Sequence, residues 1–390
     1  MKRIVLSSIV ASTVLLAGGY KIPENSANAL ALGAANVAHN HNSADAAFYN
    51  PAKMVFMSDE NHIDVNLMYV GLDNISYKST DGSVDESSES ENFIIPSFHY
   101  VSEKFDNSRA RVGVSIVSPG GLSKRWDGTL GSQKAKEFTL QTVEVNPTAA
   151  FEISKDFGFA VGLRIVHSKG IVKNAYYDME GDGLDFGYNL ALAYQPVKEL
   201  EIGITYRSKI DLNLDGDTSR VVAGLTNSDA SVSVPLPGAL NVALAYTLPT
   251  ETTIEFVYER TYWSAYSELD FDFTDPVTNV VLGNPIEKDW SDSSSYRLGV
   301  TQKLDTLTLM GGVVIDESPV PEKTLGFELP DTDSVALSLG ARYAIDKNID
   351  IALSALYSMH DERDVKNSSL DGEFSGGDVL MISAGVGYRF

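Results

Sequence analysis

Six histidines, one of them next to a serine, are the residues of this chain whose types most suggest catalysis. His39-Asn40-His41 has the order of a nuclease signature, but it lies in a segment without the fold that such a site needs. His167 precedes Ser168, yet neighbours in a strand point to opposite faces, so they do not form a phospholipase pair. No Gly-x-Ser-x-Gly elbow or glycine-rich phosphate loop is present. We therefore expect no enzyme activity, no catalytic residue, no bound metal and no cofactor.

Charge and composition exclude further classes of function. The 390 residues include 53 acidic and 30 basic ones, a net charge of −23, and no basic stripe that could hold nucleic acid. The absence of cysteine excludes disulfides, thiolate catalysis and cysteine-based zinc sites. An acidic, serine-rich stretch over 81–91 favours a solvated loop over a site bridged to lipopolysaccharide by divalent cations.

The N-terminus has the three parts of a secretory signal. Met1-Lys2-Arg3 is basic, Ile4 to Leu16 is apolar, and Ala17-Gly18-Gly19 offers small residues for cleavage. The apolar run is shorter than the ~20 residues that a membrane-spanning helix needs. We predict a signal peptide over residues 1–18, cleaved at about 17–19. The mature protein is then periplasmic, extracellular or in the outer membrane.

From residue 62 onward the chain repeats the pattern of a half-exposed strand. In the terminal run 378–390, Leu380, Ile382 and Val386 alternate with small or polar residues, which indicates a β-strand. The fourteen strands that we predict by this pattern cover 64–72, 93–102, 109–117, 138–153, 157–171, 184–194, 200–211, 239–248, 253–263, 296–304, 306–315, 335–345, 349–359 and 378–390.

The connections between these strands alternate between short turns and long polar loops. The predicted long loops are 74–92, 119–137, 172–183, 212–237, 264–292, 316–333 and 360–377. This rhythm is typical of an antiparallel transmembrane β-barrel, whereas a soluble sandwich has no reason for it. We predict an all-β, 14-stranded, monomeric outer-membrane barrel with both chain ends on the periplasmic side. Phe390 would be the terminal aromatic that the barrel-assembly machinery recognises.

A barrel of this size needs something to fill it. The predicted inward positions carry small residues such as Gly187, Gly203 and Gly340, which leave a lumen. The segment before the strands is rich in Ala and Asn and fits short helical turns in a confined space. We therefore predict two parts, an N-terminal plug over 19–61 and the barrel over 62–390. The alternative is a flexible periplasmic tail.

Several short motifs, in their order along the chain, resemble the FadL/TodX family of outer-membrane transporters of hydrophobic compounds. They include Gly19-Tyr20-Lys21-Ile22-Pro23-Glu24-Asn25-Ser26, Phe48-Tyr49-Asn50-Pro51-Ala52 and Ser118-Pro119-Gly120-Gly121-Leu122. Further matches are Phe186-Gly187-Tyr188-Asn189, Thr205-Tyr206-Arg207-Ser208, Asp316-Glu317-Ser318-Pro319-Val320-Pro321 and Leu329-Pro330-Asp331.

This resemblance implies a 14-stranded barrel closed by a hatch, and passive transport of long-chain fatty acids or other hydrophobic molecules. It places the hatch signature at Phe48, Asn50, Pro51 and Ala52. It also places an inward kink of the third strand at Ser118, Pro119, Gly120 and Gly121, with a gap in the wall beside it. Lateral release is physically sound because burial in lipid is worth about 0.8 kcal/mol per CH₂.

The resemblance also implies basic residues that bind a ligand carboxylate. By motif position these are Lys288, nine residues before Arg297, and Lys169 on the fifth strand. The alternatives are an ordinary loop lysine for Lys288 and a lumen lysine paired with a hatch carboxylate for Lys169. The loop over 172–183 is shorter than the corresponding loop of the family, which helps to form an external hydrophobic landing site. Whether this chain has that landing site is therefore open. The choice of ligand between fatty acids and smaller aromatics or alkanes is open for the same reason.

Two other functions remain open on the sequence. The barrel could be a porin-like channel for polar solutes, or a structural or adhesive surface protein that acts through its long loops. Trp126, Trp263 and Trp290 lie near the loop ends of strands and could form an aromatic girdle or a hydrophobic mouth; we expect the girdle for Trp263.

Overall fold

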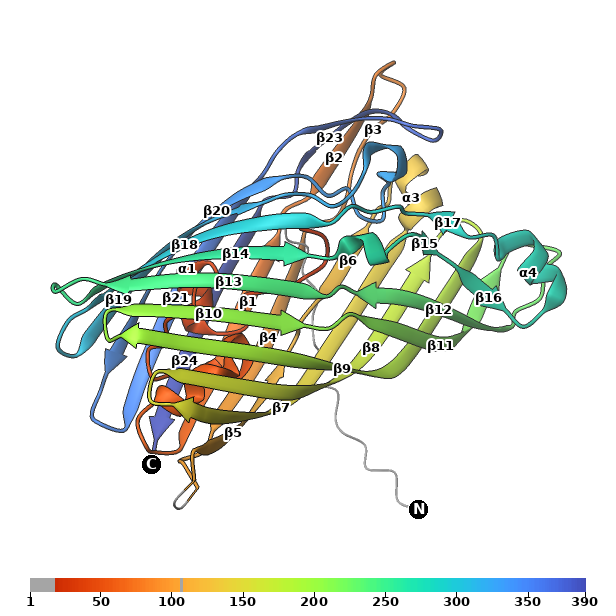
Figure 1. The fold of residues 1–390 in the computed structure, drawn as a ribbon. Coiled ribbons are helices and arrows are strands. Elements are labelled where there is room, and N and C mark those ends of the chain that lie inside the picture. Colours follow the sequence, from red (N-terminus) through yellow and green to blue (C-terminus); the bar gives the residue numbers. More distant parts are fainter. Residues whose placement is uncertain (1–17, 106–107) are drawn as a thin grey trace.

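The chain forms a closed β-barrel in a computed structural model that describes residues 18–105 and 108–390 (Figure 1). The first strand, β1 (His62–Leu72), pairs antiparallel with β4 on one side and with the last strand, β24, on the other, so the sheet closes on itself. The predicted signal peptide lies outside the described residues apart from Gly18.

The wall has fourteen crossings, as predicted. Its sheet contains 18 strands, and four crossings are each built from two consecutive segments. The crossings are β1; β4 (Glu91–Val101); β5 (Ala110–Val117) with β6 (Gly121–Arg125); β7 (Glu137–Ser154); β8 (Phe157–Lys173); β9 (Tyr177–Val197); β10 (Leu200–Arg207) with β11 (Ile210–Val221); β12 (Asp229–Leu236) with β13 (Ala239–Thr247); β14 (Thr252–Thr261) with β16 (Phe271–Phe273); β18 (Ser293–Lys303); β19 (Leu307–Asp316); β20 (Ser334–Ala344); β21 (Ile349–His360); and β24 (Val379–Arg389).

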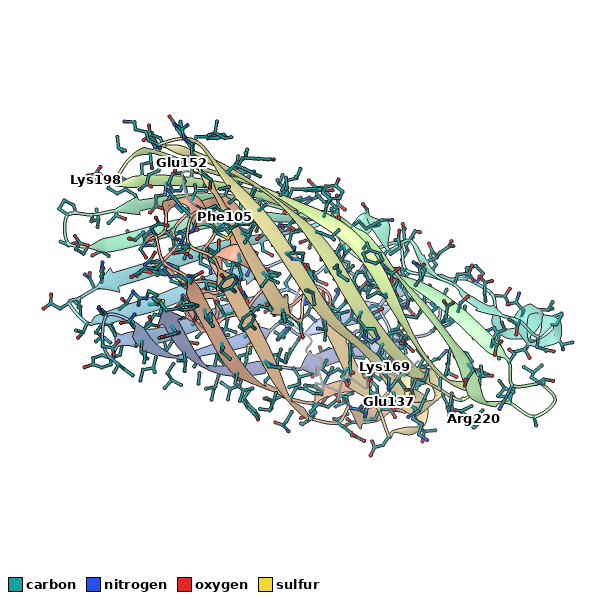
Figure 2. All side chains as sticks on the ribbon, turned by 90° about the horizontal axis from the view of Figure 1, so that it is seen from below. Phe105, Glu137, Glu152, Lys169, Lys198 and Arg220 are labelled. Carbon is teal, nitrogen blue, oxygen red and sulfur yellow. The ribbon has the colours of Figure 1, made fainter. Side chains whose placement is uncertain are left out.

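The two faces of the wall follow from the alternation in the sequence. On β24, Leu380, Ile382 and Val386 face outward and are 40–49% exposed, whereas Met381 and Ser383 face inward and are at most 1% exposed. An apolar outer band is what a barrel in a lipid bilayer requires. Short turns join strands at one end and long connections at the other; Figure 2 labels Glu152 and Lys198 near the first end and Lys169, Glu137 and Arg220 near the second.

The N-terminal segment lies inside the barrel. It contains α1 (Ala27–Leu32), α2 (Ala46–Tyr49) and the 3₁₀ helix η1 (Pro51–Phe56). Ser26 caps α1 by accepting a hydrogen bond from Ala29 N, and Gly33, at φ 57°, ends it in the left-handed conformation. α1 packs against β18 to β21 and β24, and η1 against β7, β8 and β9. Among the described residues, no helix has the length and hydrophobicity to cross a membrane.

Small residues on the wall make room for this plug. A Cβ atom at Gly340 would come within 2.6 Å of the Ala31 side chain, and one at Gly312 would collide with the Leu32 backbone. The plug is therefore packed against the wall, and a flexible tail does not fit the buried residues of α1. The domain limits at 19–61 and 62–390 stay predictions.

Two of the predicted loops are in fact strands. The predicted loop 212–237 consists largely of β11 and β12, and the predicted loop 172–183 is mostly covered by β8 and β9. Beyond the breaks at 208–209 and 237–238 the polarity of the wall reverses. Leu212 and Val234 face inward and are buried, whereas Asp211 and Asn213 face out. These strands alternate with polar residues outside, which is why a search for apolar outer faces classed them as loops.

The remaining elements gather at the loop end. A small sheet contains β2 (Ile75–Ser79), β3 (Asp85–Ser87), β22 (Arg363–Lys366) and β23 (Asp371–Gly376). The other elements are β15 (Glu268–Leu269), β17 (Ile286–Glu287), α3 (Thr129–Ala135), α4 (Pro276–Leu282), η2 (Trp263–Ala265) and η3 (Glu322–Thr324).

The described chain does not have both ends at the short-turn side. Phe390 exchanges two backbone hydrogen bonds with Asn61 there (3.0 and 3.1 Å). Gly18, in contrast, lies toward the loop end, where its carbonyl accepts a 3.0 Å bond from the Trp263 indole. The N-terminal segment therefore runs along the lumen from the loop side to the short-turn side.

Candidate functional site

An apolar cavity, here called the chamber, lies at the loop end of the barrel, beyond the plug. Its cavity volume is about 40 Å³. Strands supply Leu140, Leu214 and Phe271 to its lining, and loops supply Trp290 and Val320. The reversed polarity of β11 and β12 creates this cavity, because their apolar side chains point inward where the barrel projects beyond its lipid-facing band.

Tyr20 of the plug contributes to the wall of the chamber on the side toward the plug. Its ring centroid lies 4.6 Å from that of Trp263, 6.2 Å from Tyr266 and 5.9 Å from Trp290, mostly edge to face. Its hydroxyl donates a 2.5 Å hydrogen bond to the Pro235 carbonyl. The expectation that Trp263 belongs to an outer girdle is wrong, because its side chain is fully buried in this aromatic cluster.

Two further cavities flank the chamber. The outer cavity, of about 360 Å³, shares Lys288 and Glu328 with the chamber and is lined also by loop residues such as Asn367. The inner cavity, of about 70 Å³, is lined by Phe48 and Pro119 among others. The three cavities form a series from the loops to the middle of the lumen, and Tyr20 stands beside the step from the chamber to the inner cavity.

The third crossing breaks where the kink was predicted. β5 ends at Val117 and β6 begins at Gly121. The break turns inward to the plug: Ile22 N donates to Pro119 O (3.1 Å), and Gly121 N donates to Tyr20 O (2.8 Å). A Cβ atom at Gly120 would lie 2.8 Å from the Tyr20 carbonyl, so glycine permits this approach.

The seam between β4 and the third crossing lacks backbone pairing beside this break, and we call this unpaired stretch the open seam. The Glu91 side chain of β4 nevertheless bonds to Ser123 and Arg125 of β6 across its outer part. The β4–β5 ladder ends at the pair Phe98↔Ile116, and the next backbone bridge joins Ser88 to Trp126. Between these points the two segments share no ladder among the described residues. Pro96 of β4 falls in this unpaired stretch, where its missing N–H costs no ladder bond. The backbone ladder of the wall is thus interrupted close to residues that line the chamber, such as Leu122, and the inner cavity, such as Pro119.

A family profile described as outer membrane protein transport protein (OMPP1/FadL/TodX) matches residues 8–390. The chain belongs to this family. The match confirms the predicted resemblance and the outer-membrane location, and it makes the protein a transporter rather than an enzyme.

Individual relatives agree with the family. The long-chain fatty acid transport protein of Escherichia coli O6:H1 is 23% identical over 405 residues, covering 90% of this chain and 89% of that protein. Among solved structures, a Pseudomonas aeruginosa FadL homologue superposes with a TM-score of 0.83 at 18% identity, covering 95% and 100% of the two chains. The Ralstonia pickettii toluene transporter TbuX gives 0.72 at 18% identity, covering 94% and 99%. These structural likenesses show the FadL/TodX barrel fold.

Lys288, predicted to bind a carboxylate, lies between the chamber and the outer cavity and is 4% exposed. Its ammonium group forms an ion pair with Glu328. Burial alone would raise the pKa of the Glu328 carboxyl, but Lys288 outweighs this effect and holds that pKa below its ordinary value. Lys288 is therefore at the cavity with its charge already neutralised.

Lys169 does not reach the chamber. It lies on the outer face of β8, opposite Asp182 of β9 in the ladder, and forms a 2.5 Å ion pair with Glu180. Its side chain is 42% exposed, while its neighbour Gly170 lines the chamber. Successive side chains of a strand point to opposite faces. Lys169 is therefore next to the chamber-lining Gly170 in the sequence, but its side chain points to the outer face of the barrel.

The hatch motif ties the plug to the wall. Asn50 caps η1 by accepting a hydrogen bond from Ala52 N (3.1 Å), and its amide donates to Val37 O (2.8 Å) and to Leu192 O of β9 (3.1 Å). Pro51 occupies the first position of η1, where it needs no N–H partner. Phe48 lies under the Arg207 guanidinium, 4.3 Å from the ring centroid, and lines the inner cavity.

A buried ionic cluster, here called the Arg297 cluster, holds the other end of the plug. Arg297 donates to Gly33 O at 3.1 Å and lies 3.3 Å from Glu259 and 3.8 Å from both Glu24 and Asp316. Lys21 completes the cluster with a 2.5 Å ion pair to Glu259. Three carboxylates therefore share two cations in a buried site, and burial raises the pKa of Glu24 to about 7 although Arg297 acts in the opposite direction.

The free energy of unfolding should therefore fall as pH rises from about 4.5, the ordinary value of the Glu24 carboxyl, to about 7. In this window the folded carboxyl binds a proton that the unfolded one has lost, so stability declines by up to about 3 kcal/mol and then levels off. Denaturant unfolding in detergent at pH 5 and pH 8 would measure this. Glu24→Gln should flatten the profile, and an unchanged slope in that variant would assign the dependence to other groups.

Apart from Trp290, which was named as a possible part of a hydrophobic mouth, the chamber residues Glu328, Tyr20 and Tyr266 were not predicted as site residues. They come from the plug and two different loops, and none lies in a periodic pattern. Only the apolar and aromatic character of the stretches around 263–271 and 325–329, unusual for solvated loops, could have pointed to them.

Proposed function

We propose that the protein moves hydrophobic small molecules passively from the outside into the outer membrane. A ligand passes through the outer cavity into the chamber, moves past Tyr20, and leaves sideways through the open seam at the kink. Ser118, Pro119, Gly120 and Gly121 form the inner edge of that path. Phe48, Asn50, Pro51 and Ala52 keep the plug in place so that the lumen is no water-filled pore.

The position of the chamber beside the interrupted wall carries this proposal. Leu122, the second residue of β6, lines the chamber just past the kink, and Pro119 lines the inner cavity just before it. An apolar molecule that passes from the chamber to the kink would reach the level of the lipid without crossing the plug, and its overall transfer from water to hydrocarbon is favourable. A porin-like route for sugars does not fit an apolar chamber above a packed plug.

The partners follow from this route. The family's members named above are transporters of long-chain fatty acids and of toluene, and we propose ligands of that hydrophobic kind here. Lipopolysaccharide and outer-membrane lipid would surround the barrel, which would act as a monomer with its short turns and Phe390 in the periplasm. The assembly machinery would recognise the terminal strand.

Filling the chamber tests the proposal. Leu140→Trp adds a ring to a buried lining position. We expect uptake of an uncharged, hydrophobic fluorescent probe into proteoliposomes to drop roughly tenfold or more, because overfilling a cavity costs about 1–3 kcal/mol. Leu190→Trp, the same change at a 39% exposed position on the outside of β9, should leave uptake unchanged. Equal uptake by both variants would contradict a route through the chamber.

A further inference from the structure

The chamber has one pair of charges, and it is internally balanced. We propose that Glu328 is a specificity-determining residue: its carboxylate pairs with Lys288 in the place that a ligand carboxylate would otherwise take. The chamber therefore accepts uncharged ligands with a polar head group and rejects carboxylates. This inference rests on the proposed function and names the ligand class of the same site.

Glu328 and Lys288 lie together where the chamber meets the outer cavity. The Lys288 side chain is 5% exposed and that of Glu328 25%, and both line the chamber and the outer cavity. Gly326 has no side chain, and a Cβ atom there would collide with the Glu328 carboxylate. Thr324 donates a 2.6 Å hydrogen bond to the Lys288 carbonyl. Thr324 thus fixes the Lys288 backbone, and Gly326 leaves the space that the Glu328 carboxylate occupies.

A carboxylate ligand meets two obstacles at this pair. The lysine charge is already neutralised, so the ligand has to displace Glu328 or share Lys288 with it. In either case one carboxylate is left beside another in an apolar cavity, where an unpaired charge is strongly disfavoured. An uncharged ligand avoids both obstacles and leaves the pair intact.

The chamber also offers hydrogen-bond donors to a neutral head group. The Tyr266 hydroxyl and the Trp290 indole N–H both belong to chamber-lining residues, and neither has a hydrogen-bond partner within the described part of the chain. Burial raises the pKa of the Tyr266 hydroxyl, and Glu328 raises it further, so the hydroxyl stays protonated. A hydroxyl or ester oxygen of a ligand can accept from these donors, and a hydroxyl can also donate to Glu328.

Two probes of equal chain length and different head groups distinguish the effect of the ligand's charge on binding from the effect of its apolar tail. In nanodiscs at pH 8, we expect the change in tryptophan emission on titration to show that the wild-type protein binds 1-dodecanol more tightly than dodecanoate. Glu328→Gln frees the lysine charge and should strengthen dodecanoate binding by roughly 10- to 100-fold, the effect of one charge-assisted hydrogen bond. Binding of 1-dodecanol should stay within about twofold.

A nearby ion pair provides the matched control. Glu287 pairs with Lys323 at 2.9 Å at the outer cavity, and both side chains are more than half exposed. Glu287→Gln removes the same charge and should change neither affinity, because exposed pairs contribute little. If Glu287→Gln acts like Glu328→Gln, the effect is one of net charge and the proposal fails.

Other outcomes separate this inference from the transport proposal. Wild-type protein that binds dodecanoate at least as tightly as 1-dodecanol would overturn the role of Glu328 while leaving hydrophobic transport intact, and this comparison needs no variant. Tyr266→Phe should weaken 1-dodecanol roughly 2- to 10-fold and leave dodecane unchanged; equal loss of both would remove the donor role. Binding of none of the probes would overturn the transport proposal itself.

Discussion

Deleting Gly120 in a Pro119→Val background should abolish uptake of hydrophobic compounds while the barrel still folds. The register predicts this. Val117 pairs with Glu144 of β7 and Gly121 pairs with Gln141, so the third crossing takes four residue steps where β7 takes three. The extra residue pushes the chain into the lumen, as in a β-bulge. Removing it, with a strand-forming residue in place of proline, restores equal steps and lets the crossing run straight beside β4.

The control keeps the extra residue. Pro119→Val alone retains the four steps, so the break and the open seam should persist and uptake should continue. Uptake into proteoliposomes and permeability to a sugar should be measured together. Loss of hydrophobic uptake without sugar leakage supports lateral release. Leakage would show that the plug, which bonds to Pro119 and Gly121, has been displaced instead. Full uptake by the straightened barrel would contradict release through this seam.

The sequence predicted the wall of the barrel well because one physical rule governs it. Each crossing that faces lipid must carry apolar residues on alternate positions, as Leu380 and Ile382 do, and this pattern is visible in a single chain. The same rule failed for β11 and β12, which project beyond the lipid. There the outer face meets water, and Asp211 and Asn213 replace the apolar residues. The alternation continues with its polarity reversed.

The site was harder to predict because it is assembled from segments far apart in the chain. The kink could be located, since proline and glycine within a strand mark a break. Lys288 was placed at the cavity only through the resemblance, and no pattern in the sequence showed that Glu328, forty residues later, neutralises it. Lys169 shows the limit of motif position: a single step along β8 separates the chamber at Gly170 from the outer surface.

The second large effect is expected from Arg297→Met in the Arg297 cluster. This substitution should destabilise the folded protein by about 3–5 kcal/mol, because removing one partner from a buried ion pair typically costs this much. The guanidinium is 3% exposed and is the cation nearest to Glu24 and Asp316 in the cluster. Methionine fills similar volume but leaves these carboxylates buried without their partner. The Gly33 carbonyl also loses its 3.1 Å hydrogen bond.

The plug should lose its stability before the wall does. The wall keeps its own backbone ladders, whereas Glu24 and Gly33 of the plug lose their contacts with Arg297 on β18. We therefore expect proteolysis within residues 20–50 and leakage of sugars before the barrel itself unfolds in urea. Arg260→Met on neighbouring β14 is the matched control. That side chain is 35% exposed and lies 3.7 Å from Asp292, so its removal should cost less than about 1 kcal/mol.

Restoring the charge balance distinguishes electrostatics from packing. Adding Glu24→Gln and Asp316→Asn to Arg297→Met removes the two carboxylates that the first change leaves unpaired, and Lys21 still neutralises Glu259. The triple variant should recover most of the lost stability and the protection of the plug. If it stays as unstable as the single variant, the guanidinium acts through its bond to Gly33 and its packing, and the buried charges do not anchor the plug.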